Sequence, residues 1–251
     1  MPKFNQKYFL TFVILGVIIY PQKMRAQDSG RDRSCVARAI QILREHNPRG
    51  YAVITQLKDP QETWRYIDCS SPDLGLGTLV HEGVHFLNGE LSLDNDRRTY
   101  FYADGTSSPV DSSIIFRRNE ILSLMSASER SRNYVETYVS NEEMQNGSIH
   151  MLLDELNAYT HGLRTSVETA SVLPLPNPRS ERDGLASLMF FTKLSLARIQ
   201  AGHPEIWQRL RSNADYFEAI RRMWRLAEST LVDACKVANL GLHDTAILNS
   251  L

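Results

Sequence analysis

The chain has almost no net charge and no repetitive or low-complexity sequence. Its 251 residues carry 28 Lys and Arg against 29 Asp and Glu, a formal net charge of −1 at pH 7. Because the two signs are evenly scattered, no long-range field would attract nucleic acid or an anionic membrane surface. Internal repeats and a glycine-rich phosphate-binding loop are also missing. With 42% apolar residues the length suits one sizeable core, so a single domain is expected.

One segment alone is apolar enough to engage a membrane, and it lies at the N-terminus. Lys3 and Lys7 precede an apolar run over residues 8–20, as in a secretory signal peptide covering residues 1–26. That run is shorter than the roughly 20 residues that a membrane span needs. Because Arg25 makes a poor cleavage site, an uncleaved anchor stays open as the alternative. We expect an exported protein, periplasmic or secreted.

Cysteine is scarce, with only Cys35, Cys69 and Cys235. Their spacing matches neither a zinc knuckle nor a redox C-x-x-C pair, so we assign them no catalytic role. In an oxidising compartment three cysteines give one disulfide and one free thiol. All three pairings stay open, and three reduced thiols are the alternative.

The strongest chemical signal is His81-Glu82-Gly83-Val84-His85, which matches the pattern H-E-x-x-H. On a helix, residues four apart share one face, so both imidazoles can reach one metal ion while Glu82 lies at the adjoining edge. Zinc lowers the pKa of a water that it binds to about 7, and a nearby carboxylate can take the proton and deliver it to the leaving group. His81 and His85 are therefore candidate ligands, and Glu82 is the candidate general base.

A helix is predicted to frame this motif over residues 72–88. Ser71 is expected to cap it, Pro72 to occupy its first position and Gly89 to end it. Three glycines fall in or beside this segment: Gly75, Gly77 and Gly83. Each costs an isolated helix roughly 1 kcal/mol, which leads us to expect close packing against another backbone.

Catalytic zinc needs a third protein ligand. The metzincin pattern would require a glycine and a histidine shortly after His85, and the sequence has neither at those positions. The best candidate is Glu155, on a helix predicted from residue 148 to about 170. There Ala158 and Gly162 share its face, so small residues would allow close approach to the metal helix.

H-E-x-x-H followed some tens of residues later by a helix with E-x-x-A resembles the gluzincin class of zinc metallopeptidases. The resemblance covers these two short segments. It implies that His81, His85 and Glu155 bind Zn²⁺, that Glu82 is the general base, and that the metal helix belongs to a zincin-like fold.

One position departs from the class, since Tyr159 stands where many gluzincins have an acidic residue. We therefore expect Asp154 or Asn157 to orient a histidine instead. Tyr159 is a candidate donor to the developing oxyanion, or a packing residue. His161 is a candidate to bind metal or steady the oxyanion, and His150 is a weaker ligand candidate. The other histidines are expected at the surface: His46, His203 and His243.

The remaining pattern is that of an α+β, mainly helical fold with a small sheet beside the metal helix and a C-terminal helical bundle. Helices are predicted over residues 32–45, 148–170, 180–201, 204–211 and 212–238. Short strands are predicted over residues 51–55, 63–67, 99–102 and 134–139. A peptide substrate could add itself to the edge of such a sheet.

Together with the resemblance, these features predict an exported zinc-dependent metallopeptidase that hydrolyses peptide bonds of protein or peptide substrates. No nucleic-acid partner is expected, and no membrane contact apart from a possible N-terminal anchor. One alternative is a zinc-dependent amidase acting on cell-wall or other non-peptide amides. Another is a noncatalytic exported binding protein with a structural or accidental histidine pair. The oligomeric state stays open.

Overall fold

The computed structural model describes residues 32–95, 97–110, 116–141, 148–173, 175, 180–241, 245–248 and 251. The predicted signal peptide and His243 lie outside the described residues. Helices form most of the described chain, and its strands form one two-stranded antiparallel sheet, which confirms the mainly helical α+β class. Within these ranges, every helix falls short of the length or hydrophobicity that a bilayer span requires.

The first described elements are all helical, although two of them were predicted as strands. They are α2 (Arg33–His46), α3 (Pro48–Gln56) and the 3-10 helix η1 (Pro60–Tyr66). The strands predicted over residues 51–55 and 63–67 are therefore wrong. Asn47 accepts a hydrogen bond from the N–H of Gly50, and a proline follows in the first turn, so this turn-like sequence starts a helix. Asp59 caps η1 in the same way.

The helix that carries the H-E-x-x-H motif is α4 (Leu76–Asp94). It begins later than predicted, at an N-cap Gly75 whose φ of +66° only glycine adopts readily. A Cβ there would also lie 2.6 Å from the carbonyl oxygen of Tyr66. Gly89 does not end the helix, and α4 continues one turn beyond it to Asp94, so the predicted stop is wrong.

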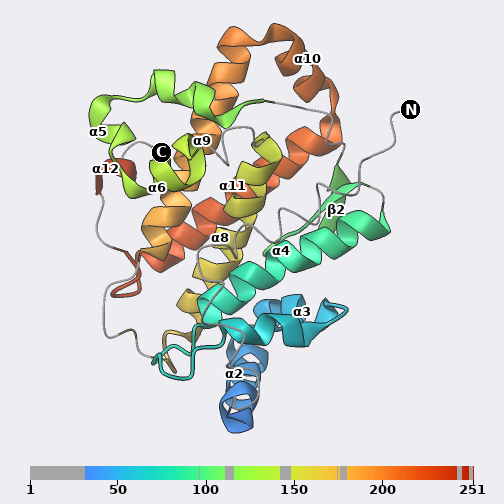
Figure 1. Ribbon diagram of the computed structural model, residues 1–251, viewed down its shortest axis with the longest axis vertical. Helices are drawn as coiled ribbons and strands as arrows, with labels where there is room; N and C mark the ends of the chain where they lie inside the picture. Colours follow the sequence, from blue (N-terminus) through green and yellow to red (C-terminus); the bar gives the residue numbers. More distant parts are fainter. Residues whose placement is uncertain are drawn as a thin grey trace.

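Helix α4 packs closely on α8 (Ile149–Thr169), which agrees with the predicted helix over residues 148–170 (Figure 1). A methyl group added to Gly162 would lie 3.0 Å from the carbonyl oxygen of Gly77. One added to Gly77 would lie 2.7 Å from the Ser166 hydroxyl. The close backbone approach expected at Gly77 is confirmed. Gly83 instead receives the side chains of α3, with Ile54 nearest.

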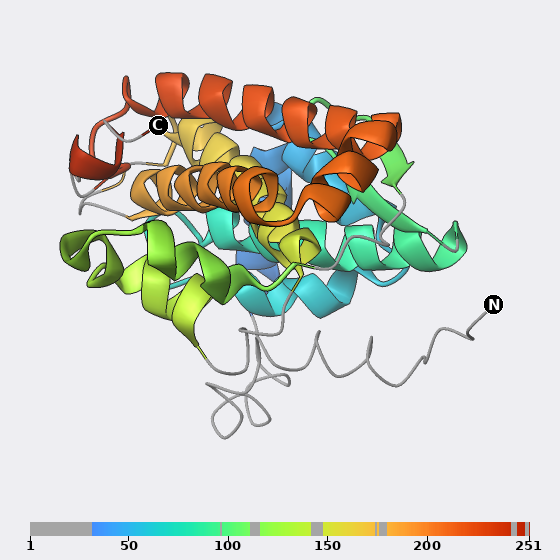
Figure 2. The ribbon, with the colours of Figure 1, turned by 90° about the horizontal axis from the view of Figure 1, so that it is seen from above.

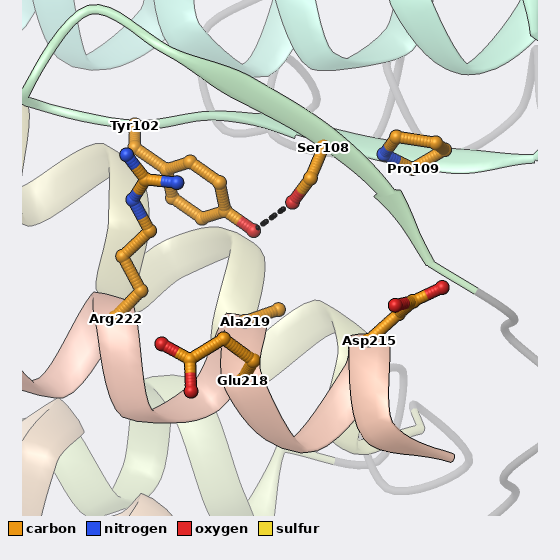
Figure 3. Close-up of a pocket in the computed structure, with 7 residues that line it drawn as sticks. All are labelled: Tyr102, Ser108, Pro109, Asp215, Glu218, Ala219 and Arg222. Atoms are coloured by element: carbon orange, nitrogen blue, oxygen red, sulfur yellow. Dashed lines mark hydrogen bonds between the residues drawn. The ribbon is translucent and has the colours of Figure 1, made fainter.

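The sheet lies against α4, as predicted (Figure 1). It pairs β1 (Arg98–Phe101) antiparallel with β2 (Ser107–Val110), which confirms the strand predicted near residues 99–102. Between β2 and the later helix α11 (Ala214–Ala234) is a pocket lined by Tyr102, Ser108, Pro109, Asp215, Glu218, Ala219 and Arg222 (Figure 3). The Tyr102 and Ser108 hydroxyls are hydrogen-bonded, and Arg222 pairs with Asp104, so these polar groups bind one another.

The last predicted strand, over residues 134–139, is also wrong. This segment forms α6 (Asn133–Val135) and the π-helix η3 (Glu136–Ser140). Val135 and Val139 are its buried residues, and their spacing of four suits one helical face better than the alternation of a strand. The segment follows the 3-10 helix η2 (Arg118–Leu124) and the short helix α5 (Ala127–Arg130).

The C-terminal part is mainly helical, as predicted, although the last long helix ends at Ala234 and not at residue 238. Its elements are α9 (Glu181–Gly202), α10 (Pro204–Ser212), α11 (Ala214–Ala234) and α12 (Thr245–Leu248). Helix α8 contacts α4, α9 and α11, and Figure 2 shows it in the middle of the molecule, with α11 along one side and α4 toward the other. Glu155 on α8 is thereby held between two hydrophobic clusters, one around α9 and α11 and one beneath α4.

A disulfide joins Cys35 of α2 to Cys69 just after η1. The third cysteine, Cys235, is free and exposed. One disulfide with one free thiol is thus confirmed, and the pairing left open by the sequence is assigned. The bond ties the N-terminal helices to the chain that leads into α4.

Replacing Cys35 by Ser is expected to lower the free energy of unfolding by about 4 kcal/mol. The bonded cysteines are 34 residues apart, and opening a loop of that size restores this much chain entropy to the unfolded state. Urea titration measures the change, with Cys235→Ser as the control that leaves it nearly unchanged. Equal stability of the two variants would contradict the assigned pairing.

Candidate metal centre

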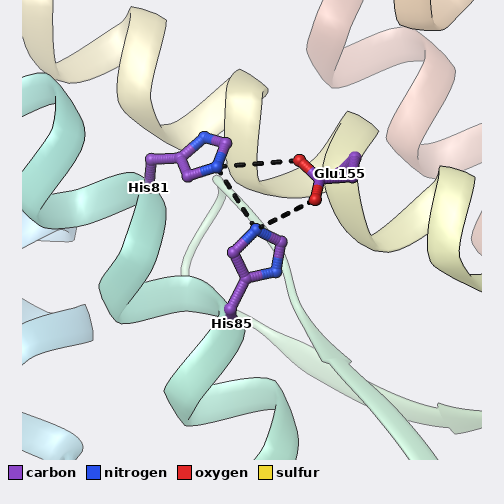
Figure 4. A group of neighbouring side chains, drawn as sticks. All are labelled: His81, His85 and Glu155. Carbon is purple, nitrogen blue, oxygen red and sulfur yellow. Dashed lines mark hydrogen bonds and ion pairs between the residues drawn. The ribbon is translucent and has the colours of Figure 1, made fainter. Parts of the chain in front are cut away.

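Three side chains from two helices meet at one point, as Figure 4 shows. His81 and His85 project from α4, and Glu155 projects from α8 on the opposite side. Their candidate ligand atoms all lie within 4.8 Å of one another. The structure therefore brings together the three residues that were predicted as metal ligands.

The spacing within this cluster suits a metal ion. The Nε2 atoms of His81 and His85 are 3.2 Å apart, and each lies 3.7 Å from a carboxylate oxygen of Glu155. Ligands that bind zinc tetrahedrally at about 2.0–2.2 Å are separated by roughly 3.3–3.6 Å. The buried Oε2 of Glu155 also has no hydrogen-bond partner among the described residues. The three groups fit a site with one coordination position left open.

Asp154 fixes the orientation of His85. Its Oδ2 accepts a hydrogen bond of 2.8 Å from Nδ1 of His85, so in the neutral ring Nε2 carries the lone pair and faces His81. Burial raises the pKa of Asp154, but the charge of His85 and this hydrogen bond outweigh burial and the net shift is downward. The prediction that Asp154 or Asn157 orients a histidine is confirmed for Asp154.

The pocket favours positive charge beside His85. Burial and the neighbouring His85 together lower the pKa of His81 to about 4, so His81 is neutral near pH 7. For His85, burial lowers the pKa, but Glu155 and Asp154 raise it more and the net shift is upward. The half-buried carboxylates of Asp154 and Glu155 thus face Nδ1 and Nε2 of His85, respectively, and anions in such a place require a cation nearby.

Glu82 lies on α4 next to the cluster but outside it. Burial raises its pKa, while His85 lowers it, and the net shift is upward. Tyr66 and Arg65 of η1 also act on this carboxyl group. The guanidinium of Arg65 is stacked between the rings of Tyr66 and Phe86, 5.1 and 5.6 Å from their centroids. Residues of η1 therefore form the wall beside Glu82.

Tyr159 lies against the cluster, whereas His161 does not join it. The Tyr159 ring meets the His81 ring edge-on at 4.8 Å, and its hydroxyl is 3.0 Å from that of Tyr138. His161 donates from Nε2 to the carbonyl of Phe101 at 3.0 Å.

The remaining histidines also lie elsewhere. His150 is buried and hydrogen-bonds to Tyr216, His203 pairs with Glu120, and His46 lies at the end of α2. None of the three belongs to the ligand cluster. His46 and His203 are both half-buried, not fully at the surface as predicted.

Sequence reasoning missed two residues near the cluster. Arg118 of η2 is fully buried, and its charge acts on Glu155 and Tyr138, while burial lowers its pKa to about 10. Tyr138 lies on the π-helix η3, a rare local geometry that is frequent at functional sites. Both come from segments with no motif, so only the fold identifies them.

Comparisons with family models, curated proteins and solved structures gave no match. The chemistry of the metal cluster is therefore the basis for assigning a function.

We predict that His161 makes the metal-free protein less stable in acid. Its pKa is lowered by burial to about 4, against about 6.5 in the unfolded chain. Below pH 6.5 the unfolded state binds the proton first, so the free energy of unfolding falls until the pH reaches the folded pKa, by roughly 3 kcal/mol in total.

His161→Gln, which keeps a donor, is expected to flatten this dependence. Urea titrations in EDTA between pH 7.5 and 4 measure it for both proteins. Parallel pH curves for the variant and the unmodified protein would contradict the prediction.

Proposed function

We propose that this chain is a zinc-dependent metallopeptidase of the gluzincin type, with a zincin-like arrangement of α4 and α8. His81, His85 and Glu155 would hold Zn²⁺, and Glu82 would be the general base. The observation that carries the proposal is the convergence of two imidazole Nε2 atoms and one carboxylate at ligand-like spacing. A second observation supports it: His85 is hydrogen-bonded to Asp154, an arrangement typical of metal-bound histidine.

Each side chain has a separate task in this proposal. Bound zinc supplies Lewis acidity, which polarises a carbonyl group and lowers the pKa of water to about 7. Glu82 takes a proton from the attacking water and returns it to the leaving nitrogen. Because burial raises its pKa, this carboxylate is a better base than an exposed glutamate.

The tyrosine pair is suited to stabilising the oxyanion. The hydroxyls of Tyr138 and Tyr159 are hydrogen-bonded at 3.0 Å, so one donates to the other. The accepting hydroxyl keeps its own proton, which it can donate to a substrate oxygen. The Tyr159 ring contacts that of His81, which supports a role for the tyrosine pair beside the proposed metal ion.

Export is part of the proposal. The Cys35–Cys69 disulfide supports it, because such bonds persist in oxidising compartments and are rare in the cytosol. The proposed substrates are proteins or peptides.

Glu82→Gln is expected to bind one zinc per chain, as the unmodified protein does, but to lose about 10²–10⁴-fold in turnover. The reason is that Glu82 lies outside the ligand cluster and acts only on the proton. Glu155→Ala is expected to lose stoichiometric zinc as well as activity, because it removes a ligand. Elemental analysis after dialysis gives metal content, and mass spectrometry of a peptide mixture gives turnover.

Three results would count against the proposal. An unmodified protein without zinc would remove its basis. Unchanged zinc and activity in Glu155→Ala would show that the third ligand is wrong. Cleavage of peptidoglycan fragments but no peptide would replace the peptidase by an amidase.

A further inference from the structure

A chain of hydrogen bonds leads from the metal cluster to strand β1. Nδ1 of His85 donates to Oδ2 of Asp154, and the other carboxylate oxygen, Oδ1, accepts from Nδ2 of Asn88 at 2.8 Å. The amide oxygen of Asn88 in turn accepts from the backbone N–H of Phe101 at 2.7 Å. His85 is therefore connected to the strand through the half-buried Asp154 and the buried Asn88.

Asn88 restrains the one torsion that a single hydrogen bond would leave free. A carboxylate held only at Oδ2 can still rotate about its Cβ–Cγ bond. With Asn88 bonded to Oδ1, both oxygens of Asp154 are engaged and the plane of the group is set. Asn88 is 1% exposed, so water has little access to its amide group.

Strand β1 gives Asn88 a fixed anchor. The Phe101 carbonyl accepts from Nδ2 of Asn157 at 2.8 Å and from Nε2 of His161 at 3.0 Å. Two residues earlier in the same strand, the N–H of Thr99 donates to the Ser92 hydroxyl at 2.8 Å. Side chains of α4 and α8 thus occupy the edge of β1 that faces away from β2.

At the outer edge of β1, this arrangement leaves no free groups for the pairing with a peptide substrate that the sequence suggested. The backbone groups that strand addition needs on β1 are already hydrogen-bonded to side chains. The strand instead holds the side chains that surround the metal cluster.

We propose that Asn88 is a positioning residue of the metal centre: anchored by β1, it orients Asp154 so that His85 presents Nε2 to the ion. The inference rests on the proposed zinc site. It differs from a purely structural role because it requires an effect on metal binding larger than the effect on folding.

The chain offers a matched control in Asn157. It is also a 1% exposed amide that bonds to the Phe101 backbone, but it is not bonded to Asp154. Asn88→Ala is expected to weaken zinc binding about 10–100-fold, while Asn157→Ala changes it by a few-fold or less. Competition with a chromophoric chelator measures the dissociation constant, and thermal unfolding in EDTA compares the loss of stability.

Two further measurements separate positioning from destabilisation. In cobalt-substituted protein, Asn88→Ala is expected to change the visible absorption spectrum, whereas Asn157→Ala leaves it unchanged. In a double-mutant cycle, Asn88→Ala is expected to add little to the loss caused by Asp154→Ala, because Asn88 acts through that residue. Should Asn88→Ala fail to fold, Asn88→Ser, whose side chain is one bond shorter, replaces it.

The outcomes are distinguishable. If the unmodified protein binds zinc and Asn88→Ala binds it equally well, or if Asn157→Ala weakens it as much, the inference is overturned and the zinc site stands. If the unmodified protein binds no zinc, the proposed function fails and this inference with it.

Discussion

The site depends on how closely helices α4 and α8 approach each other. At their crossing, a side chain on Gly162 would lie 3.0 Å from the Gly77 carbonyl oxygen and 3.2 Å from Cβ of His81. A Cβ does not fit there without moving a backbone. The two glycines weaken their own helices by roughly 1 kcal/mol each, and the close approach they permit lets Glu155 reach the two imidazoles.

The close approach of α4 and α8 has an electrostatic consequence. Asp154 and Glu155 are adjacent in sequence and both half-buried beside His85, so α8 brings two carboxylates close to one imidazole. Burial alone raises the pKa of each group, yet both shifts are downward because His85 is so near. A divalent cation at the same place would balance these charges better than one shared proton. The fold and the proposed chemistry therefore share one requirement, which is positive charge at the meeting point of the helices.

The parts of the fold and of the candidate site that could be predicted are those set by residues close together in the sequence. His81 and His85 follow from a helical spacing of four, and the helix of Glu155 from its periodicity, so these parts were predictable. The helical structure of residues 51–55 and 63–67 was not predictable, because their β-branched and aromatic residues suggested strands. There Asn47 and Asp59 cap helices, and burial against α4 outweighs strand propensity. Asn88 and Arg118 could not be found, since their partners lie in distant segments and no spacing rule joins them.

The most direct test of the central claim is an anomalous-scattering map of zinc-loaded crystals recorded at the zinc absorption edge. We predict one strong peak per chain, about 2.0–2.2 Å from Nε2 of His81, Nε2 of His85 and a carboxylate oxygen of Glu155. No peak there at saturating zinc, or a peak held by other side chains, would contradict the account.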